Sequence, residues 1–541
     1  MMNTKIINIA NKYLLLCLLV FTGFACDDKD DKEDTSIPVL ISQNIEEGAV
    51  VGPNGYVELV FSKAMRQAPD TEIYFNGGVV RVTINYEKVR YTFSNMENKA
   101  CTFEIPAGAL TDMQGRAYDE DFSVNFTAKS EVAGTGKVFD VIVDSKGNGD
   151  FTSIQAAIDA APFELTAPYK IFIANGAYTE CIRVLKNKSY IHLIGESRDG
   201  VKIQFALNRV SESTNTVTWP YSIFNEDSSH RKAGYTEEQN AVVIVEGADF
   251  YAENVSIINL YGALPSRYTG GLGKDGQAEA LITRNNRFAL YNCVLVSFQD
   301  TWWCRHSSGS ENLAYIFDSQ IEGRTDYIWG SGNIFVENSK FLNTGDGAYI
   351  TASGETGTWG YVMKNCTVDG VSGITPFSFG RPYKQGTKTV WIDTQLKMDI
   401  IPAHWSSWSS LPALYGEYNT IDKNGQVIST EGKVVGSGNS AFTSSVLTSE
   451  EAAKYTYDKI VKASGWNPQE YIETPLATPT NVKLTDYVLT WDAVPNAAGY
   501  LIFMNGNYAG QTTDTTVTLN NVGSDNVYTV RTVSQNGTVS E

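Results

Sequence analysis

Two aspartates occupy similar settings in neighbouring stretches of the chain. Asp300 lies in "FQDTWW", just after the strand-like phrase "LYNCVLVS", and Asp326 lies in "GRTDYIWG", just after "IFDSQIEG". If each phrase is one turn of a coil of stacked strands, the two acids lie at the same corner of neighbouring strands ~4.8 Å apart, which brings their carboxylates within range of strong coupling. Like charges that close do not both ionise easily, so one acid keeps a proton. Such a pair can supply an acid/base and a nucleophile; the alternative is that one Asp merely caps a turn.

The phrases that precede these acids belong to a repeat. "AENVSIIN", "LYNCVLVS", "IFDSQIEG", "VENSKFLN" and "VMKNCTVDG" align on one polar residue, at Asn254, Asn292, Asp318, Asn338 and Asn365. The intervals between successive polar residues are similar, except that the first is longer and contains the glycine-rich insertion "GALPSRYTGGLGKDG". An apolar strand and a polar corner that recur at such a period are typical of a solenoid. We therefore predict a right-handed parallel β-helix over residues 136–474.

One clear helix is expected, in "FTSIQAAIDAAP". Either Thr152 or Ser153 can cap its first turn. The apolar residues fall on one face at helical spacing, at Ile154, Ala157, Ile158 and Ala161. We expect this face to plug the open N-terminal end of the solenoid.

The segments on either side of the solenoid predict smaller β domains, so the fold class is all-β. Residues 37–129 alternate short strands with turns, as in an immunoglobulin-type sandwich, and "LVFSKAM" resembles bacterial Ig-like domains. Residues 476–541 resemble a fibronectin type III module, with core aromatics at Trp491, Tyr500 and Tyr528. The first segment clusters no acid, base or nucleophile, so a spacer role is expected for it. For the second segment a spacer or docking module is expected, and the alternative is a carbohydrate-binding module.

The N-terminus predicts export. Residues 1–26 contain an apolar run that is short for a membrane span and ends at Ala25–Cys26, which resembles a lipoprotein cleavage site. The acidic stretch 27–36 resembles a surface-export signal of Gram-negative lipoproteins and predicts a flexible linker. We expect lipidation at Cys26 and an outer-membrane, surface-exposed location; the alternative is a secreted or periplasmic enzyme with a cleaved signal.

Composition and net charge limit the kinds of partner and chemistry that are expected for this chain. A net charge of −19 without a basic cluster argues against nucleic acid. The 29 Tyr, 24 Phe and 10 Trp suit a β-rich protein with stacking surfaces, whereas four His leave little material for metal or triad chemistry. Five cysteines remain after the leader, without a CxxC pair, so we expect small buried residues and neither a zinc site nor a full disulfide framework. No metal or cofactor is expected, and the chain is expected to be a monomer.

The solenoid segment resembles the pectin methylesterases, which remove methyl esters from polygalacturonate on a right-handed β-helix. Motifs match in the family's order over residues 136–419: "DSKGNGDFTSIQAAIDAAP", "NGAYTE", "GQAEAL", "FQDTWW", "DYIWG" and "FGRPY", followed by "HWSSW" and "YGEYN". One such motif would be weak evidence, but the ordered set is specific. The substrate implied by this resemblance is methyl-esterified homogalacturonan.

The resemblance also implies a role for each site residue. Asp326 would be the nucleophile, and Asp300 would protonate the leaving methanol and then activate water. Gln299 and Gln277 would donate hydrogen bonds to the oxyanion, and Arg381 would orient Asp326 and keep it ionised. Aromatic side chains would line the sugar groove, at Trp303, Trp329 and Tyr383.

The chain departs from the family pattern at several positions near the acids. Tyr383 replaces the usual Trp, Trp303 replaces the usual Tyr, and Arg324 with Thr325 replaces smaller residues, which predicts a reshaped groove. We hypothesise that Arg324 engages a galacturonate carboxylate. Residues 307–313 are interpreted as a loop insertion, and cysteines that the family commonly pairs are Ser319 and Ser339 here.

Several of these residues also have an alternative, purely structural interpretation. Gln277 could be a ladder glutamine inside the solenoid, Arg381 could form a structural salt bridge in a non-catalytic relative, and Trp302 is expected to pack rather than to bind. Other functions on the same scaffold are a pectin backbone hydrolase, a lyase and a non-catalytic surface glycan-binding protein. A serine esterase is disfavoured because the chain has no GxSxG elbow.

Overall fold

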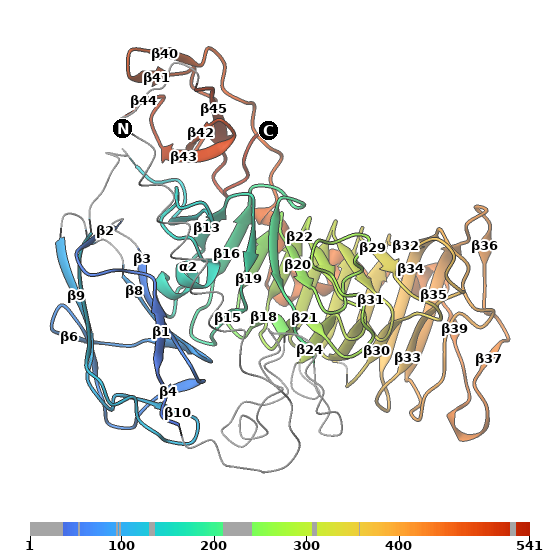
Figure 1. Ribbon diagram of the computed structural model, residues 1–541. Helices are drawn as coiled ribbons and strands as arrows, with labels where there is room; N and C mark the ends of the chain where they lie inside the picture. The colour runs from blue at the N-terminus through green and yellow to red at the C-terminus, as the bar shows by residue number, and fades with distance from the viewer. Residues whose placement is uncertain are drawn as a thin grey trace.

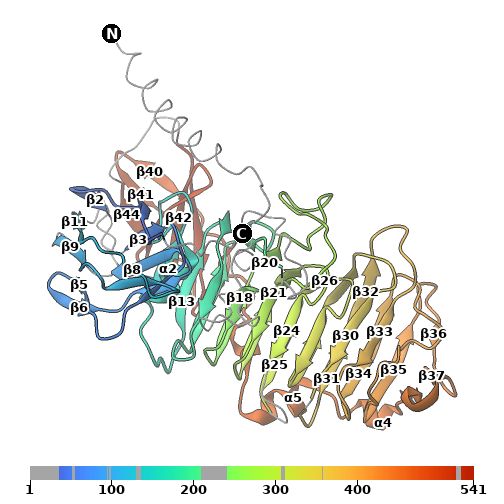
Figure 2. The ribbon, with the colours of Figure 1, turned by 60° about the horizontal axis from the view of Figure 1, so that its bottom comes forward.

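The computed structural model describes residues 36–51, 55–93, 96, 99–128, 136–208, 241–305, 311–355, 357–519 and 526–541. The leader, Cys26, nearly all of the acidic linker and part of the 307–313 insertion lie outside the described residues. The ribbon shows a long stack of parallel strands with two small β domains at one end (Figures 1 and 2). Among the described residues, no helix has the length and apolar character needed to cross a bilayer.

The long stack is a parallel β-helix built from three ladders. The first ladder contains β12 (Val141–Val143), β13 (Tyr169–Ile173), β16 (Ile191–Gly195), β19 (Phe250–Glu253), β22 (Phe288–Tyr291), β25 (Leu313–Phe317), β28 (Asn333–Glu337), β31 (Tyr361–Lys364), β34 (Lys388–Leu396) and β35 (Leu414–Ile421). The second contains β14 (Gly176–Thr179), β17 (Val201–Phe205), β20 (Ser256–Asn259), β23 (Val294–Val296), β26 (Gln320–Gly323), β29 (Lys340–Asn343) and β32 (Thr367–Gly370). The third contains β15 (Ile182–Val184), β18 (Ala241–Val245), β21 (Glu279–Thr283), β24 (Trp302–Arg305), β27 (Ile328–Ser331), β30 (Tyr349–Ser353) and β33 (Ser378–Pro382). The predicted parallel solenoid is therefore present, while its right-handed sense stays a prediction.

The polar residues on which the repeat was aligned form the corners between the first and second ladders. Each follows a first-ladder strand and has a positive φ between 47° and 56°, at Asn254, Asn292, Asp318, Asn338 and Asn365. Asn and Asp tolerate this left-handed conformation because their short polar side chains bond locally. The longer first interval of the repeat is explained by an insertion loop, residues 260–278, between β20 and β21.

Serine hydroxyls occupy the corner positions at which the family commonly pairs cysteines. Ser319 Oγ accepts a hydrogen bond from Cys293 N at 3.0 Å, and Ser339 Oγ accepts one from Ser319 N at 3.1 Å. These bonds tie successive coils together. The five cysteines of the described residues are free, and their predicted burial is confirmed.

The predicted helix is α2 (Ile154–Ala160), and Ser153 is its N-cap. The Ser153 Oγ accepts from Ala156 N at 3.3 Å, and Glu180 accepts from Ile154 N at 2.8 Å and from Gln155 N at 3.1 Å. The apolar face of the helix is buried in the same core as the first coils. Short helices that were not predicted occur farther along, at α4 (Ser449–Ala452) and α5 (Tyr457–Ile460), with 3-10 turns η2 (Gly438–Ser440), η3 (Lys462–Ser464) and η4 (Pro468–Tyr471).

The segment that carries α4, α5, η3 and η4 returns along the outside of the first ladder. Its apolar residues Leu447, Ile460 and Trp466 pack against outward-facing residues of that ladder, including Tyr315 and Phe335. Before it, four short strands close the C-terminal end of the coil: β36 (Val427–Ile428), β37 (Val434–Val435), β38 (Phe442–Thr443) and β39 (Ser445–Val446). The return segment thus covers one face of the solenoid and leads the chain back towards its first coils.

The N-terminal domain is a two-sheet sandwich. One sheet has the order β1 (Leu40–Gln43), β3 (Gly55–Phe61), β8 (Lys88–Phe93), β7 (Thr83–Asn85), and the other β2 (Ala49–Val51), β11 (Phe122–Ala128), β9 (Lys99–Ile105), β5 (Ile73–Phe75), β6 (Gly78–Val80); β4 (Met65–Gln67) pairs with β10 (Leu110–Asp112). Alternating residues of both sheets fill one apolar core. The first sheet contacts the helix that plugs the solenoid, because Arg90 Nη1 donates to Ser153 Oγ at 2.9 Å.

The C-terminal domain has two three-stranded sheets. Their orders are β40 (Lys483–Thr485), β41 (Val488–Thr490), β44 (Thr516–Thr518), and β43 (Asn507–Thr512), β42 (Gly499–Met504), β45 (Tyr528–Val533). Trp491 and Tyr500 lie in its core with ring centroids 5.3 Å apart, and Tyr528 packs beside it. Phe503 and Tyr508 pack against Phe139 and Phe172 of the first coils. Both small domains therefore dock at the N-terminal end of the β-helix, well apart from its middle coils (Figure 1).

Candidate active site

The backbone places the two acids at equivalent positions of adjacent coils. Gln277, Gln299 and Thr325 form successive parallel bridges, so the residues that follow two of them, Asp300 and Asp326, stack at one corner. Asp300 N donates to Thr325 O at 3.0 Å across the two coils. Both aspartates have positive φ, 62° and 48°, and both side chains are almost fully buried. The corner joins the second ladder to the third.

Arg381 binds both oxygens of Asp326. Its Nε donates to Oδ1 at 2.9 Å and its Nη2 donates to Oδ2 at 2.6 Å. Arg381 lies on β33, two coils beyond, because Trp329 pairs with Ala352 and Ala352 pairs with Arg381 in the third ladder. A bidentate fork of this kind fixes the plane of the carboxylate as well as its charge.

Burial raises the pKa of the Asp326 carboxyl above its ordinary value, and the fork from Arg381 and the charge of Arg324 oppose that rise. The sequence predicted that Arg381 keeps Asp326 ionised and that the second acid perturbs it. The direction of the Arg381 effect agrees, but burial outweighs it and is the largest cause of the shift. The cause is the depth of the corner, since only 8 % of the Asp326 side chain is exposed.

Gln277 and Gln299 lie on the same corner as the acids. Gln299 directly precedes Asp300, Gln277 lies one coil earlier, and both side chains are half-buried. Within the described part of the chain, neither amide takes part in an internal side-chain hydrogen bond, which differs from the expectation for a ladder glutamine inside the solenoid. Two amide N–H groups therefore remain available to an oxygen placed beside the acids.

Aromatic side chains continue from the acids across the outer face of the third ladder. Trp303 stacks on Trp329 with centroids 4.4 Å apart and planes 13° apart, Trp329 meets Tyr383 at 6.1 Å, and Tyr383 meets Trp408 at 5.4 Å. Trp303 was predicted to face the groove, yet only 9 % of it is exposed, whereas Tyr383 is 36 % exposed. Trp303 thus packs beside Trp329 on the neighbouring strand and adds little exposed surface to this row.

Trp302 belongs to the core, as expected. It is fully buried, and its Nε1 donates to Thr283 Oγ1 at 3.1 Å on the preceding coil. Successive strand residues point to opposite faces, so Trp302 and Trp303 separate to the inside and the outside of the coil.

Arg324 lies next to the acids but already has partners in the protein. Its Nε donates to Asp346 O at 2.8 Å, and its Nη1 donates to Thr325 Oγ1 at 2.9 Å and approaches Asp275 Oδ2 at 3.4 Å. The side chain is 32 % exposed. Its guanidinium is therefore held at the edge of the acid corner, partly open to solvent.

Comparison with known proteins identifies the family of this fold and site. Residues 140–464, more than half of the chain, match the Pectinesterase family. The chain belongs to the pectinesterase family. The matched residues include both acids, both glutamines and Arg381.

Relatives of this pectinesterase domain occur in plants. The Arabidopsis thaliana protein Pectinesterase/pectinesterase inhibitor 3 is 25 % identical, with 82 % of this chain and 68 % of that protein aligned. Pectinesterase 2 of the same organism is 28 % identical over 60 % of this chain, which spans only 51 % of that protein's length. The solved pectin methylesterase from carrot is 22 % identical with a TM-score of 0.47, and covers 64 % of this chain and 99 % of its own.

Two residues at the pectinesterase site were not anticipated as contacts of Arg381. The Arg381 Cζ lies 4.3 Å from the ring centroid of Tyr349 and 4.0 Å from that of Trp408. Trp408 lies in the "HWSSW" motif. The motif marked this segment as part of the family pattern but did not predict the contact of Trp408 with Arg381. Tyr349 gave no signal, because a Tyr that begins an ordinary strand is indistinguishable from a core aromatic.

The insertion loop is anchored beside the site by a buried carboxylate that sequence reasoning also missed. Glu322 on β26 accepts from Arg267 Nη2 at 2.9 Å and from Tyr268 OH at 2.8 Å. Burial raises the pKa of the Glu322 carboxyl, and Arg267 opposes that rise. The loop is therefore tied to the coil that carries Asp326.

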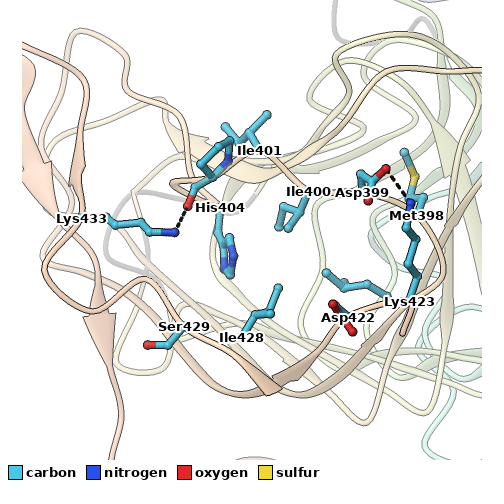
Figure 3. A pocket seen from close by; sticks show the side chains of 12 residues that line it. Met398, Asp399, Ile400, Ile401, His404, Asp422, Lys423, Ile428, Ser429 and Lys433 are labelled. Carbon is cyan, nitrogen blue, oxygen red and sulfur yellow. Dashed lines mark hydrogen bonds and ion pairs between the residues drawn. The ribbon is translucent and has the colours of Figure 1, made fainter. Parts of the chain in front are cut away.

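A cavity of about 310 Å³ lies farther along the solenoid and contains none of the predicted site residues (Figure 3). Its charged side chains are occupied: Lys423 pairs with Asp399 at 2.8 Å, and Lys433 Nζ donates to Pro402 O at 2.7 Å. His404, in its wall, bonds Glu417 through Nδ1 at 2.8 Å. Groups paired in this way hold the end of the coil together.

Proposed function

We propose that this chain hydrolyses the methyl esters of polygalacturonate to pectate and methanol, with Asp326 as nucleophile and Asp300 as acid/base. The observation that carries the proposal is the buried Asp326 held by the Arg381 fork, one coil from Asp300, in a chain of the pectinesterase family.

The first half of the reaction forms a covalent intermediate. The Asp326 carboxylate attacks the carbonyl carbon of the methyl ester, and negative charge develops on the carbonyl oxygen. The amides of Gln299 and Gln277 donate hydrogen bonds to that oxygen, and one such preorganised donor is worth ~3 kcal/mol of barrier. Asp300 gives its proton to the departing methoxy oxygen, so methanol leaves and an acyl anhydride links the sugar to Asp326.

The second half restores the enzyme. Asp300, now charged, removes a proton from water as the water oxygen attacks the carbonyl carbon of the anhydride. The bond to Asp326 breaks and Asp300 holds the proton again. The product leaves as the free acid of galacturonate and loses its remaining carboxyl proton to solvent. Arg381 acts in both halves because it holds the carboxylate of Asp326 in one plane and offsets its charge when it is the leaving group.

The exposed aromatic row supplies the sugar-binding surface of the proposal. Trp329 and Tyr383 contact the pyranose units, and Trp303 fixes Trp329 by stacking on it from the neighbouring strand. Arg324 engages a free galacturonate carboxylate on the same chain of sugars, since its side chain is partly exposed beside Asp326. Polygalacturonate that is partly de-esterified is the substrate this arrangement suits.

The decisive experiment is a methanol-release assay on methylated pectin. Wild type should release methanol without new reducing ends or unsaturated products, and Asp326→Ala should release none. The matched control is Asp199→Ala, which removes an aspartate that is 82 % exposed and paired with Arg198. Equal release by wild type and Asp326→Ala removes the mechanism; new reducing ends indicate a hydrolase, unsaturated ends a lyase, and binding without chemistry a glycan-binding protein.

A separate assay tests Arg324. Arg324→Ala should raise the KM for partly de-esterified pectin more than the KM for fully methylated pectin. An unchanged KM and rate on both substrates would contradict the proposed contact between Arg324 and a galacturonate carboxylate.

The flanking domains and the leader complete the proposal. We assign the N-terminal sandwich as an Ig-like domain and the C-terminal one as a fibronectin type III-like domain, which dock at the end of the solenoid as spacers. Cys26 carries lipid and anchors the enzyme to the outer membrane with the catalytic coils outside the cell. Metabolic labelling with a fatty acid should mark the wild type and not Cys26→Ala; label on both chains contradicts the anchor.

A further inference from the structure

The guanidinium of Arg381 meets aromatic rings as well as Asp326. Tyr349 and Trp408, here called the aromatic clamp, place their ring centroids 4.3 and 4.0 Å from the Arg381 Cζ. A guanidinium is planar and weakly hydrated, and it is stabilised over a ring face when water is partly excluded. The Arg381 side chain is only 22 % exposed, so these contacts are partly desolvated.

The two rings come from different places in the fold. Tyr349 opens β30, on the coil between those of Asp326 and Arg381, and its N–H donates to Arg324 O at 2.8 Å. Trp408 lies on the stretch between β34 and β35, which continues the stack beyond β33. That stretch is fastened by Phe379 N to His404 O at 2.8 Å and by Ser406 N to Gly380 O at 3.0 Å.

A further bond secures the stretch that carries Trp408. His404 Nδ1 and Glu417 Oε2 are 2.8 Å apart, and both side chains are buried. His404 lies in the wall of the cavity in Figure 3. His404 has a φ of 58°, so the chain turns sharply there before it reaches Trp405. The Trp405 ring packs on Tyr415 at 4.5 Å. The segment that leads to Trp408 is thus fixed by buried contacts.

We propose that Tyr349 and Trp408 are positioning residues of the esterase reaction, which hold the plane of Arg381 so that its fork grips both oxygens of Asp326. This inference rests on the proposed function, because it assigns a role to side chains around the nucleophile. The clamp acts through Arg381 and touches no reacting atom.

The clamp has a consequence for the pH profile. The charged and titratable groups around the Asp326–Arg381 pair are Arg324, Asp300, Tyr349 and Tyr415. Only Arg381 itself and Arg324 favour the charged form of Asp326. Burial raises the pKa of Asp326 and Arg381 lowers it. If Arg381 is held less firmly, that pKa rises farther, and the acidic limb of kcat/KM moves to higher pH.

The test compares Tyr349→Leu, Tyr349→Phe and Trp408→Leu with wild type by methanol release across pH. Tyr349→Leu and Trp408→Leu should each lower kcat roughly tenfold, the size of a partly desolvated cation–π contact. For Tyr349→Leu, KM should change less than about twofold and the acidic limb should move up. Tyr349→Phe keeps the ring and should recover kcat and the limb, and Tyr487→Leu, an exposed tyrosine of the C-terminal domain, controls for loss of an aromatic side chain.

Three outcomes overturn the clamp. One is wild-type kcat and pH profile in Tyr349→Leu, and a second is a raised KM with unchanged kcat, which makes Tyr349 a sugar-binding ring. The third is a crystal structure of folded Tyr349→Leu or Trp408→Leu in which both Arg381–Asp326 contacts remain at 2.9 and 2.6 Å. If wild type releases no methanol, the proposed function fails and that crystal structure alone decides the clamp.

Discussion

Replacing Arg381 by alanine removes two charge-assisted hydrogen bonds from a carboxylate that water barely reaches. The bonds measure 2.9 and 2.6 Å, and the exposed fractions of the two side chains are 22 % for Arg381 and 8 % for Asp326. Removing one partner of a buried pair costs ~3–5 kcal/mol, because the other charge stays buried. Since Arg381 is partly exposed, water can enter its place, and the lower end, about 3 kcal/mol, applies.

If the fork stabilises the ionised Asp326 by the same amount on the way to the transition state, a loss of about 3 kcal/mol corresponds to roughly a 100-fold fall in kcat/KM at neutral pH. Burial already raises the pKa of Asp326 against the opposition of Arg381, so the variant's acidic limb should move to higher pH. Part of the lost rate should return as the pH is raised, because the nucleophile is then ionised again. Methanol release from methylated pectin over a pH series measures both effects.

The raised pKa of Asp326 also predicts how the destabilisation caused by Arg381→Ala depends on pH. An acid whose pKa is raised by folding adds stability below its unfolded pKa and loses that contribution as the pH rises through its folded pKa. Arg381→Ala raises the folded pKa further, so its destabilisation should be small in acid and larger at neutral pH. Denaturant unfolding of wild type and Arg381→Ala, in acid and at neutral pH, measures the difference in stability.

Two controls bracket the Arg381 result. Arg381→Lys keeps a charge without the fork and should fall between wild type and alanine. Arg66→Ala removes an exposed arginine of the N-terminal domain, bonded to Thr111 at 3.3 Å, and should leave the rate unchanged. An Arg381→Ala rate within about threefold of wild type at every pH, with an unmoved acidic limb, would refute the reasoning, because the expected loss is ~100-fold.

Three further substitutions separate the parts of the site. Gln299→Ala should lower kcat by about 100-fold with little change in KM, since the lost donor acts on developing charge; a loss confined to KM contradicts the oxyanion role. Trp302→Ala should destabilise the fold by ~3–5 kcal/mol in denaturant unfolding, because a fully buried indole leaves a cavity in the coil; a loss below about 1 kcal/mol is incompatible with its core position. Glu322→Ala leaves Arg267 and Tyr268 without their shared acceptor and should increase proteolytic cutting of the insertion loop, while unchanged cutting would show that other contacts hold it.

The coil and the position of its acids followed from the sequence because both depend on local regularities. Asn254 and its counterparts could be aligned because each ends an apolar strand at a left-handed corner, and that pattern repeats once per coil. The interval between Asp300 and Asp326 matches one such repeat, which placed the two acids on adjacent coils without knowledge of any side-chain contact. Ser153 could be recognised as a cap because capping involves only the first turn of one helix.

Tertiary structure alone decided what surrounds those acids. The pairing of Arg381 with Asp326 joins segments far apart in the chain, and it entered the sequence reasoning only through the resemblance to a family. The exposure of Trp303, the partners of Arg324 and the contacts of Tyr349 and Trp408 depend on which loops cover each coil and where they return. Loop lengths vary from coil to coil, so no period in the sequence carries that information. Local pattern determined the scaffold and the acid pair, whereas the packing of distant segments decided the electrostatic surroundings of the nucleophile.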